Sequence, residues 1–147
     1  METHSYWLRQ VPGKPLFPDV EWNKPEQKSH AGKLGIIGGN KLGFLAVGDA
    51  YSAARDAGVG QVRALLPIVL KKSVPTTITD IIYGANNPSG GLSKDAAPEM
   101  GALGAWADAV LLIGDAGRNS ETAILYEDFI RSYGGQLTIT RDAIDLL

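Results

Sequence analysis

The chain has 147 residues, of which 44% are hydrophobic and 20% charged, and its formal net charge is -2. These values predict one soluble, cytoplasmic domain that is large enough to bury a hydrophobic core. The near-neutral net charge excludes general attraction to nucleic acid or anionic membranes. The absence of cysteine excludes disulfides and thiolate chemistry, and no apolar run approaches the roughly 20 residues that span a bilayer.

Residues 1–32 differ in composition from the rest of the chain. They contain four prolines, which exclude a long regular helix, and the large apolar side chains of two tryptophans and one phenylalanine. We expect an N-terminal arm that either packs on the domain or forms a subunit contact; packing is favoured because exposed aromatic groups are a liability. The residues concerned are Pro12, Pro15, Pro18, Pro25, Trp7, Phe17 and Trp22.

From residue 33 onward, apolar runs of strand length alternate with helical patterns. The predicted strands cover residues 34–37, 61–66, 77–83, 109–113 and 136–140, and the predicted helices cover residues 42–57, 94–106 and 120–133. This alternation predicts an α/β fold in which helices flank a mostly parallel sheet. The chain stops shortly after a last helical segment begins, so we expect the domain of residues 33–147 to be incomplete at its C-terminus.

The turn after the first predicted strand carries Gly38, Gly39 and Asn40. Glycine at such a turn lets backbone N–H groups approach a ligand, and the N-terminus of the following helix favours an anion. The spacing fits neither the dinucleotide fingerprint nor the Walker loop, because Phe44 and Leu45 stand where lysine and a hydroxyl residue would be needed. The alternative that these glycines merely tighten the turn stays open.

A second turn of the same kind follows the fourth predicted strand. Here Arg118 could pair with a phosphate, and Asp115 could hold a ribose hydroxyl or a magnesium-bound water, beside Gly114 and Gly117. The alternative is a solvated loop with an N-cap for the next helix. Asp142, after the last predicted strand, is a further candidate ligand contact, although an N-cap role is favoured for it.

The two turns should lie together, because parallel strands present their carboxyl ends at one edge of the sheet. We therefore expect Gly39 and Gly117 to share one rim, with their N–H groups facing the same hollow. The sequence predicts a site for a phosphate-bearing small molecule there. No residue of the chain is assigned as catalytic or as a metal ligand.

Four segments together resemble a known family. Residues 33–40 (KLGIIGGN) and 53–67 (AARDAGVGQVRALLP) are similar to the opening of the ribokinase-like NAD(P)H-hydrate dehydratases. Residues 108–114 (DAVLLIG) resemble the family's strand before a Gly-Pro-Gly-Leu-Gly turn, and residues 136–147 (QLTITRDAIDLL) resemble its strand before Asp-Ala-Asp-Ala-Leu. The second turn is one residue short and lacks the proline, and Thr140 replaces the first aspartate. The family's later His-Pro-Gly-Glu and Gly-Ser-Gly-Asp segments have no counterpart in these 147 residues.

The resemblance implies a ribokinase-like fold and repair of hydrated nicotinamide cofactors, with ATP or ADP and Mg²⁺. The hydrate of NAD(P)H would be phosphorylated and phosphate then eliminated, and Ala46 and Gly117 would contact this substrate. Without the segment that supplies the anion hole and catalytic aspartate, transition-state charge is not stabilised, so we expect no turnover by this chain. Two alternatives stay open: a non-catalytic nucleotide-binding or assembly module, which pairs with itself or with a partner chain that completes the fold, and an unrelated small nucleotide-binding protein.

Overall fold

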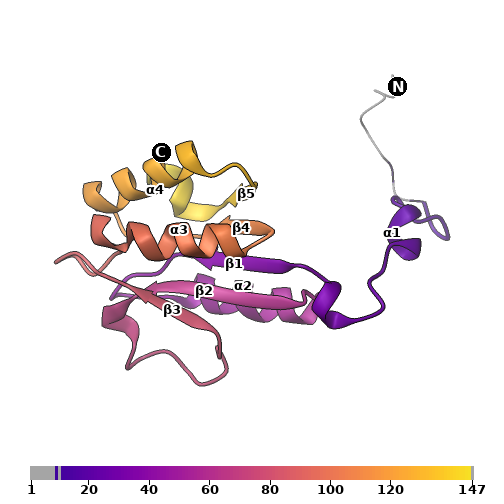
Figure 1. Cartoon of the computed structure of the whole chain (residues 1–147), viewed down its shortest axis with the longest axis horizontal. Helices are drawn as coiled ribbons and strands as arrows, with labels where there is room; N and C mark the ends of the chain where they lie inside the picture. The colour runs from indigo at the N-terminus through magenta and orange to yellow at the C-terminus, as the bar shows by residue number, and fades with distance from the viewer. Residues whose placement is uncertain (1–8, 10, 147) are drawn as a thin grey trace.

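The computed structural model describes residues 9 and 11–146 and contains a five-stranded, all-parallel sheet (Figure 1). The strand order is β3-β2-β1-β4-β5, so the direction of chain progression reverses between β1 and β4. The α/β fold with a parallel sheet and flanking helices is thus confirmed. The strands are β1 (Lys33–Ile37), β2 (Gln61–Pro67), β3 (Ile81–Gly84), β4 (Ala109–Leu112) and β5 (Gln136–Ile139).

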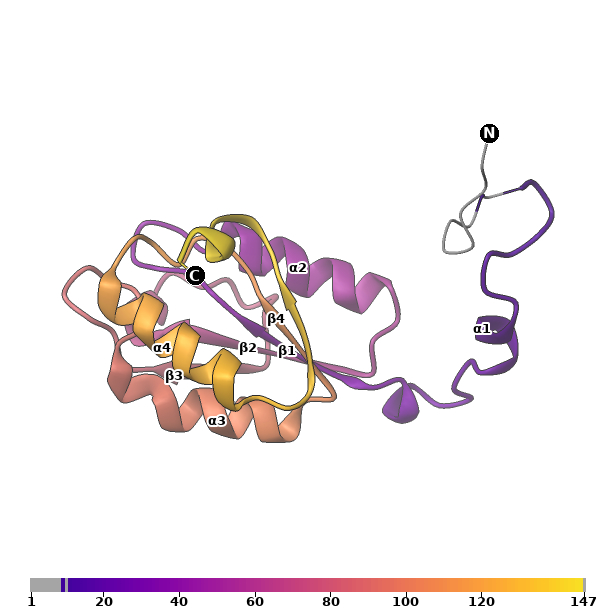
Figure 2. The ribbon, with the colours of Figure 1, turned by 90° about the horizontal axis from the view of Figure 1, so that it is seen from above.

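Helices cover both faces of the sheet. Helix α2 (Leu45–Asp56) lies on one face, and α3 (Ala97–Trp106) and α4 (Ser120–Ser132) lie on the other (Figure 2). The remaining helical elements are short: α1 (Asp19–Trp22) and the 3-10 turns η1 (Lys28–His30), η2 (Ile68–Leu70), η3 (Lys94–Ala96) and η4 (Arg141–Leu146). In the part of the chain that the structure describes, no helix is long and apolar enough to cross a membrane.

Each face of the sheet has its own hydrophobic core. The adjacent β1 residues Ile36 and Ile37 point to opposite faces; Ile36 joins the cluster under α2, and Ile37 joins the cluster under α3 and α4. Both side chains are fully buried, as expected for a parallel sheet that is covered on both sides. The predicted apolar stripe of α2 is confirmed, with Val47, Tyr51 and Ala54 buried against the sheet.

Two predicted elements, one helix and one strand, begin later than expected. Helix α2 begins at Leu45 rather than at residue 42, because Asn40 and Gly43 form an antiparallel bridge that holds the preceding residues in a turn. Strand β3 begins at Ile81 rather than at residue 77. Helix α3 accommodates Pro98 because this residue lies in the first turn, where the N–H that proline lacks would have no partner within the helix.

The N-terminal arm does not pack on the domain in its described part. It leads away from the start of β1 (Figures 1 and 2), and its side chains Trp22 and Phe17 are 88% and 61% exposed. The packing that the sequence favoured is therefore wrong for these two residues. Trp7 lies outside the described residues.

Candidate functional site

The two glycine turns meet at the carboxyl edge of the sheet, between β1 and β4. The Gly39 N–H donates to the Gly114 carbonyl over 3.4 Å, and a Cβ on Gly117 would lie 3.3 Å from the amide nitrogen of Asn40. The prediction that Gly39 and Gly117 share one rim is confirmed. This rim is the point at which the strand order reverses, and we call it the β1/β4 crevice.

The backbone donors of the first turn do not face an open hollow, however. The N–H groups of Gly38, Gly39 and Asn40 donate to the carbonyls of Leu65, Gly114 and Gly43 at 3.5, 3.4 and 3.0 Å. All three residues are buried. The expectation that these donors point into a shared hollow is wrong, because each of them forms a hydrogen bond with a backbone carbonyl of the protein itself.

Gly38 is needed because the two turns pack closely. A Cβ at this position would lie 2.5 Å from the carbonyl oxygen of Ile113 and 2.9 Å from that of Gly114. Backbone atoms cannot rotate away from such a contact. The glycine therefore allows the end of β1 to approach the end of β4, which closes the inner part of the crevice.

Asp115, in the turn after β4, caps the N-terminus of helix α2. Its Oδ2 accepts the Ala46 N–H at 2.8 Å, and its carbonyl accepts the amide of Asn40 at 2.6 Å. Among the described residues it is the one non-glycine with a positive φ, 65°, a conformation that aspartate tolerates better than most residues. Phe44, at the N-cap position, supplies no side-chain cap. The carboxylate of Asp115 thus lies at the positive end of α2, where an anionic ligand would otherwise bind.

This cap also bears on the role that the family resemblance implies for Ala46. The residue is 1% exposed, and its N–H is engaged by Asp115. In this arrangement Ala46 offers no surface to a dinucleotide. Gly117 is half-buried at the rim and remains accessible.

The start of α4 forms the other side of the crevice. The side chain of Asn119 accepts the Glu121 N–H at 2.9 Å and so supplies the N-cap that the sequence offered for this helix, and its amide donates to the Ser89 hydroxyl at 3.0 Å. The exposed Arg118 lines a hollow of about 590 Å³ that extends from the start of α4 to Asp145 in η4. The backbone of Asp142 lies in η4, and its side chain is outside the described part.

Lys41 was not singled out from the sequence, although the structure places it at the same rim. Its N–H donates to the Gly90 carbonyl at 2.9 Å, and its ammonium group donates to the Pro88 carbonyl at 3.4 Å. Gly90 has a φ of 85°, and a Cβ there would collide with the Lys41 side chain. The lysine lies outside the Walker position, so only its place directly after the glycine turn could have drawn attention to it.

A buried polar network fixes the loop that follows β3. The hydroxyl of Thr122 donates to the Leu92 carbonyl at 2.8 Å and accepts the amide of Asn87 at 2.9 Å. Asn87 also accepts the Gly91 N–H at 3.2 Å. Because every partner is satisfied inside the protein, this loop is held rigidly between the start of α4 and Lys41.

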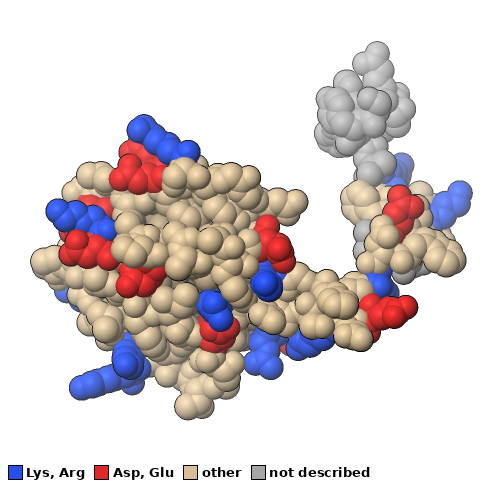
Figure 3. Space-filling model, in the orientation of Figure 1, with Lys and Arg blue, Asp and Glu red and all other residues tan. Residues whose placement is uncertain are grey.

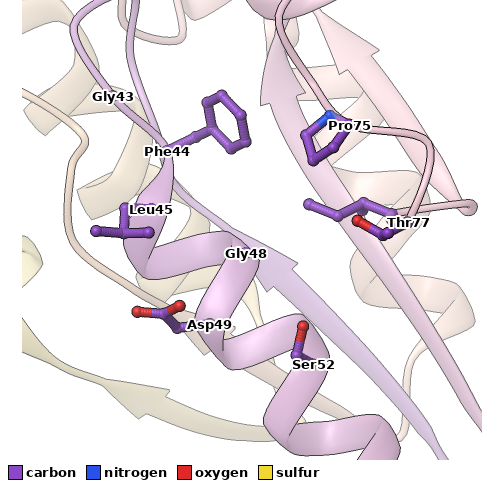
Figure 4. Close-up of a pocket in the computed structure, with 9 residues that line it drawn as sticks. Gly43, Phe44, Leu45, Gly48, Asp49, Ser52, Pro75 and Thr77 are labelled. Atoms are coloured by element: carbon purple, nitrogen blue, oxygen red, sulfur yellow. The ribbon is translucent and has the colours of Figure 1, made fainter.

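A separate hollow of about 490 Å³ lies between the first half of α2 and the segment before β3. Figure 4 shows the Phe44 ring extending from the start of α2 toward Pro75, with Asp49, Ser52 and Thr77 as the polar groups around it. None of the site residues predicted from the sequence lines this hollow. It is therefore distinct from the β1/β4 crevice.

The crevice offers binding groups rather than a catalytic apparatus. Lys41 and Arg118 supply exposed positive charge, and Asp115 supplies a half-buried carboxylate. Within residues 9 and 11–146, no three His, Asp or Glu side chains come close enough to hold a metal ion. Such a set can hold a phosphate-bearing ligand by charge-assisted hydrogen bonds.

Comparisons with known proteins assign no family to this chain. No family model matches it, and no curated protein is significantly similar. The likeness to NAD(P)H-hydrate dehydratases therefore rests on the four sequence segments alone.

Proposed function

We propose that the β1/β4 crevice binds a nicotinamide dinucleotide, in particular hydrated NAD(P)H. The observation that supports this most is the meeting of two glycine turns where the strand order reverses. Open parallel sheets bind nucleotides outside the carboxyl ends of their strands at such a point. The proposal includes a ribokinase-like origin of the domain, in keeping with the sequence segments that resemble the hydrate dehydratases.

Side chains, rather than backbone amides, hold the phosphates in this proposal. The amides of the first turn are bonded internally, and the carboxylate of Asp115 at the start of α2 repels a second anion. The diphosphate therefore lies toward Lys41, whose ammonium group lies at the Pro88 carbonyl, and toward Arg118 at the start of α4. Arginine suits this role because its planar donors match two phosphate oxygens.

The chain binds the dinucleotide without converting it. Hydrate repair in the resembled family uses ATP or ADP with Mg²⁺, but the described residues provide no metal-ligand cluster. We therefore derive no phosphoryl-transfer step through the metal. A binding role is what the remaining groups support.

Isothermal titration calorimetry of the full chain with NADH, hydrated NADH, ATP and ADP tests the proposal. We expect saturable binding of the dinucleotides at a site that Arg118→Gln weakens about tenfold through loss of a charge-assisted contact. The matched control is Arg131→Gln, because Arg131 lies on the same helix α4, eleven residues after its first residue, in an exposed pair with Glu127. Absence of saturable dinucleotide binding, or equal affinities of the two variants, would refute the proposal.

A second candidate function is assembly with another copy of the chain through the arm. The exposed side chains of Trp22 and Phe17 favour assembly, because aromatic groups that stay in water are a liability that a partner would cover. Light scattering during size-exclusion chromatography tests it. Assembly predicts a dimer or larger species that Trp22→Ala dissociates, whereas a monomer at all concentrations contradicts it.

A further inference from the structure

Another hollow lies at the opposite edge of the sheet from the crevice, where the arm joins the domain. It has a volume of about 720 Å³, and Lys24, Lys28 and His30 line it beside the turn that ends α2. A smaller hollow of about 210 Å³ adjoins it, shares Lys28 and Val59 with it, and adds Arg55. We call the two together the neck hollow. Figure 3 shows Lys and Arg side chains gathered along the lower side of this neck.

The neck hollow is held in shape by backbone contacts. The N–H groups of Gly60 and Gln61 donate to the carbonyls of Ala31 and Gly32 at 3.3 and 3.1 Å. A Cβ on Gly60 would collide with the carbonyl oxygen of Lys28. Glycine at this position therefore lets η1 dock against the start of β2, and this docking brings Lys28 to the end of α2.

The cations of the hollow are not used by the protein itself. The last carbonyls of α2 already accept backbone N–H groups: those of Ala53, Ala54 and Arg55 bond to residues 57, 59 and 58 at 2.9 to 3.1 Å. None of the ion pairs among the described residues involves Lys24, Lys28 or Arg55.

The one acid that lines these hollows is Asp80, and Arg63 neutralises it. The carboxylate of Asp80 accepts the Arg63 guanidinium at 2.8 Å. The hollow thus combines an imidazole with three cations that form no ion pair with any described residue, and these groups come from two separate segments of the chain. Its excess of positive charge contrasts with the net charge of -2 on the whole protein.

We propose that the neck hollow binds a small molecule that carries two or more phosphate groups. Lys28 lies in the wall that the two hollows share, whereas Lys24 lines only the larger hollow and Arg55 only the smaller one. Two linked phosphate groups can therefore meet more of these cations than a single phosphate can. Charge-assisted hydrogen bonds to phosphate oxygens supply the affinity. This site is independent of the β1/β4 crevice, because it lies at the amino ends of β1 and β2.

Isothermal titration of the full chain with inorganic diphosphate at low ionic strength tests the proposal. We expect saturable one-to-one binding, and Lys28→Gln and Arg55→Gln should each weaken it at least about fivefold. The matched control is Lys72→Gln, because Lys72 is an exposed lysine that lines neither hollow. No saturable binding would overturn the proposal, and so would equal weakening by Lys72→Gln, which indicates attraction by overall charge alone.

A third variant tests the shape of the hollow separately from its charge. Gly60→Ala removes no cation but displaces the backbone at Lys28, so it should weaken diphosphate binding as well. Circular dichroism verifies that this variant is folded. If it is not, the two charge variants decide the question, because their side chains are exposed and the fold does not depend on them.

Discussion

Replacing Gly38 by alanine tests whether this glycine serves close packing of the two turns. The added Cβ would lie 2.5 and 2.9 Å from the carbonyl oxygens of Ile113 and Gly114, and 3.1 Å from a side-chain carbon of Ile113. Two of the three atoms belong to the backbone at the end of β4. The close contacts with these atoms can be relieved only if the end of β1 moves away from the end of β4.

The expected cost follows from these contacts. Inserting a methyl group into a well-packed site costs about 1–3 kcal/mol, and contacts with fixed backbone atoms place this variant in the upper half of that range. The smaller conformational entropy of alanine in the unfolded chain returns about 0.4–1 kcal/mol. We therefore expect Gly38→Ala to lower the free energy of unfolding by about 2 kcal/mol.

Urea unfolding followed by far-ultraviolet circular dichroism measures this change. Gly43→Ala is the matched control, because Gly43 lies in the same turn, has no atom within 4 Å of its added Cβ and has no positive φ. It should change the free energy of unfolding by less than about 0.5 kcal/mol. If both variants are equally stable, the close approach of the two turns does not explain the glycine.

Three further variants test the hydrogen bonds of the crevice, each by urea unfolding. Asp115→Ala removes the acceptor of the Ala46 N–H and places alanine at a positive φ, so it should cost about 2 kcal/mol; a cost below 0.5 kcal/mol would contradict the cap. Asn119→Ala removes the N-cap of α4 and should cost about 1 kcal/mol, and an unchanged stability would show that the cap is dispensable. Thr122→Val leaves the buried Leu92 carbonyl without its hydroxyl donor and should cost about 1–3 kcal/mol; a neutral result would mean that water replaces the hydroxyl.

The fold could largely be read from the sequence because its signals are local. The strand pattern and the apolar stripe at Val47, Tyr51 and Ala54 are set by residues close to one another in the chain, and they match the structure. The late start of α2 was missed because it depends on the side chain of Asn40, which accepts the Leu42 N–H at 2.7 Å and favours a turn over a helix. Turn chemistry of this kind competes with helix propensity over only a few residues.

The details of the site were harder to predict because they depend on distant partners. The cap of α2 comes from Asp115, 69 residues after the N–H that it accepts, and no local pattern announces such a pairing. The position of Lys41 depends on Gly90 in a loop two strands away in the sheet. The sequence could therefore predict that the glycine turns meet. It could not predict that the N–H groups of the first turn form hydrogen bonds with backbone carbonyls of the protein itself.

Amide chemical-shift mapping determines whether a nicotinamide dinucleotide binds in the β1/β4 crevice. The full chain, labelled with ¹⁵N, is titrated with NADH and then with its hydrate. Binding of the dinucleotide in the crevice should produce saturable chemical-shift changes that cluster at residues 40–43 and 115–120, on the two sides of the crevice. Shifts confined to residues 24–31 at the neck, or no saturable shifts at all, would contradict it.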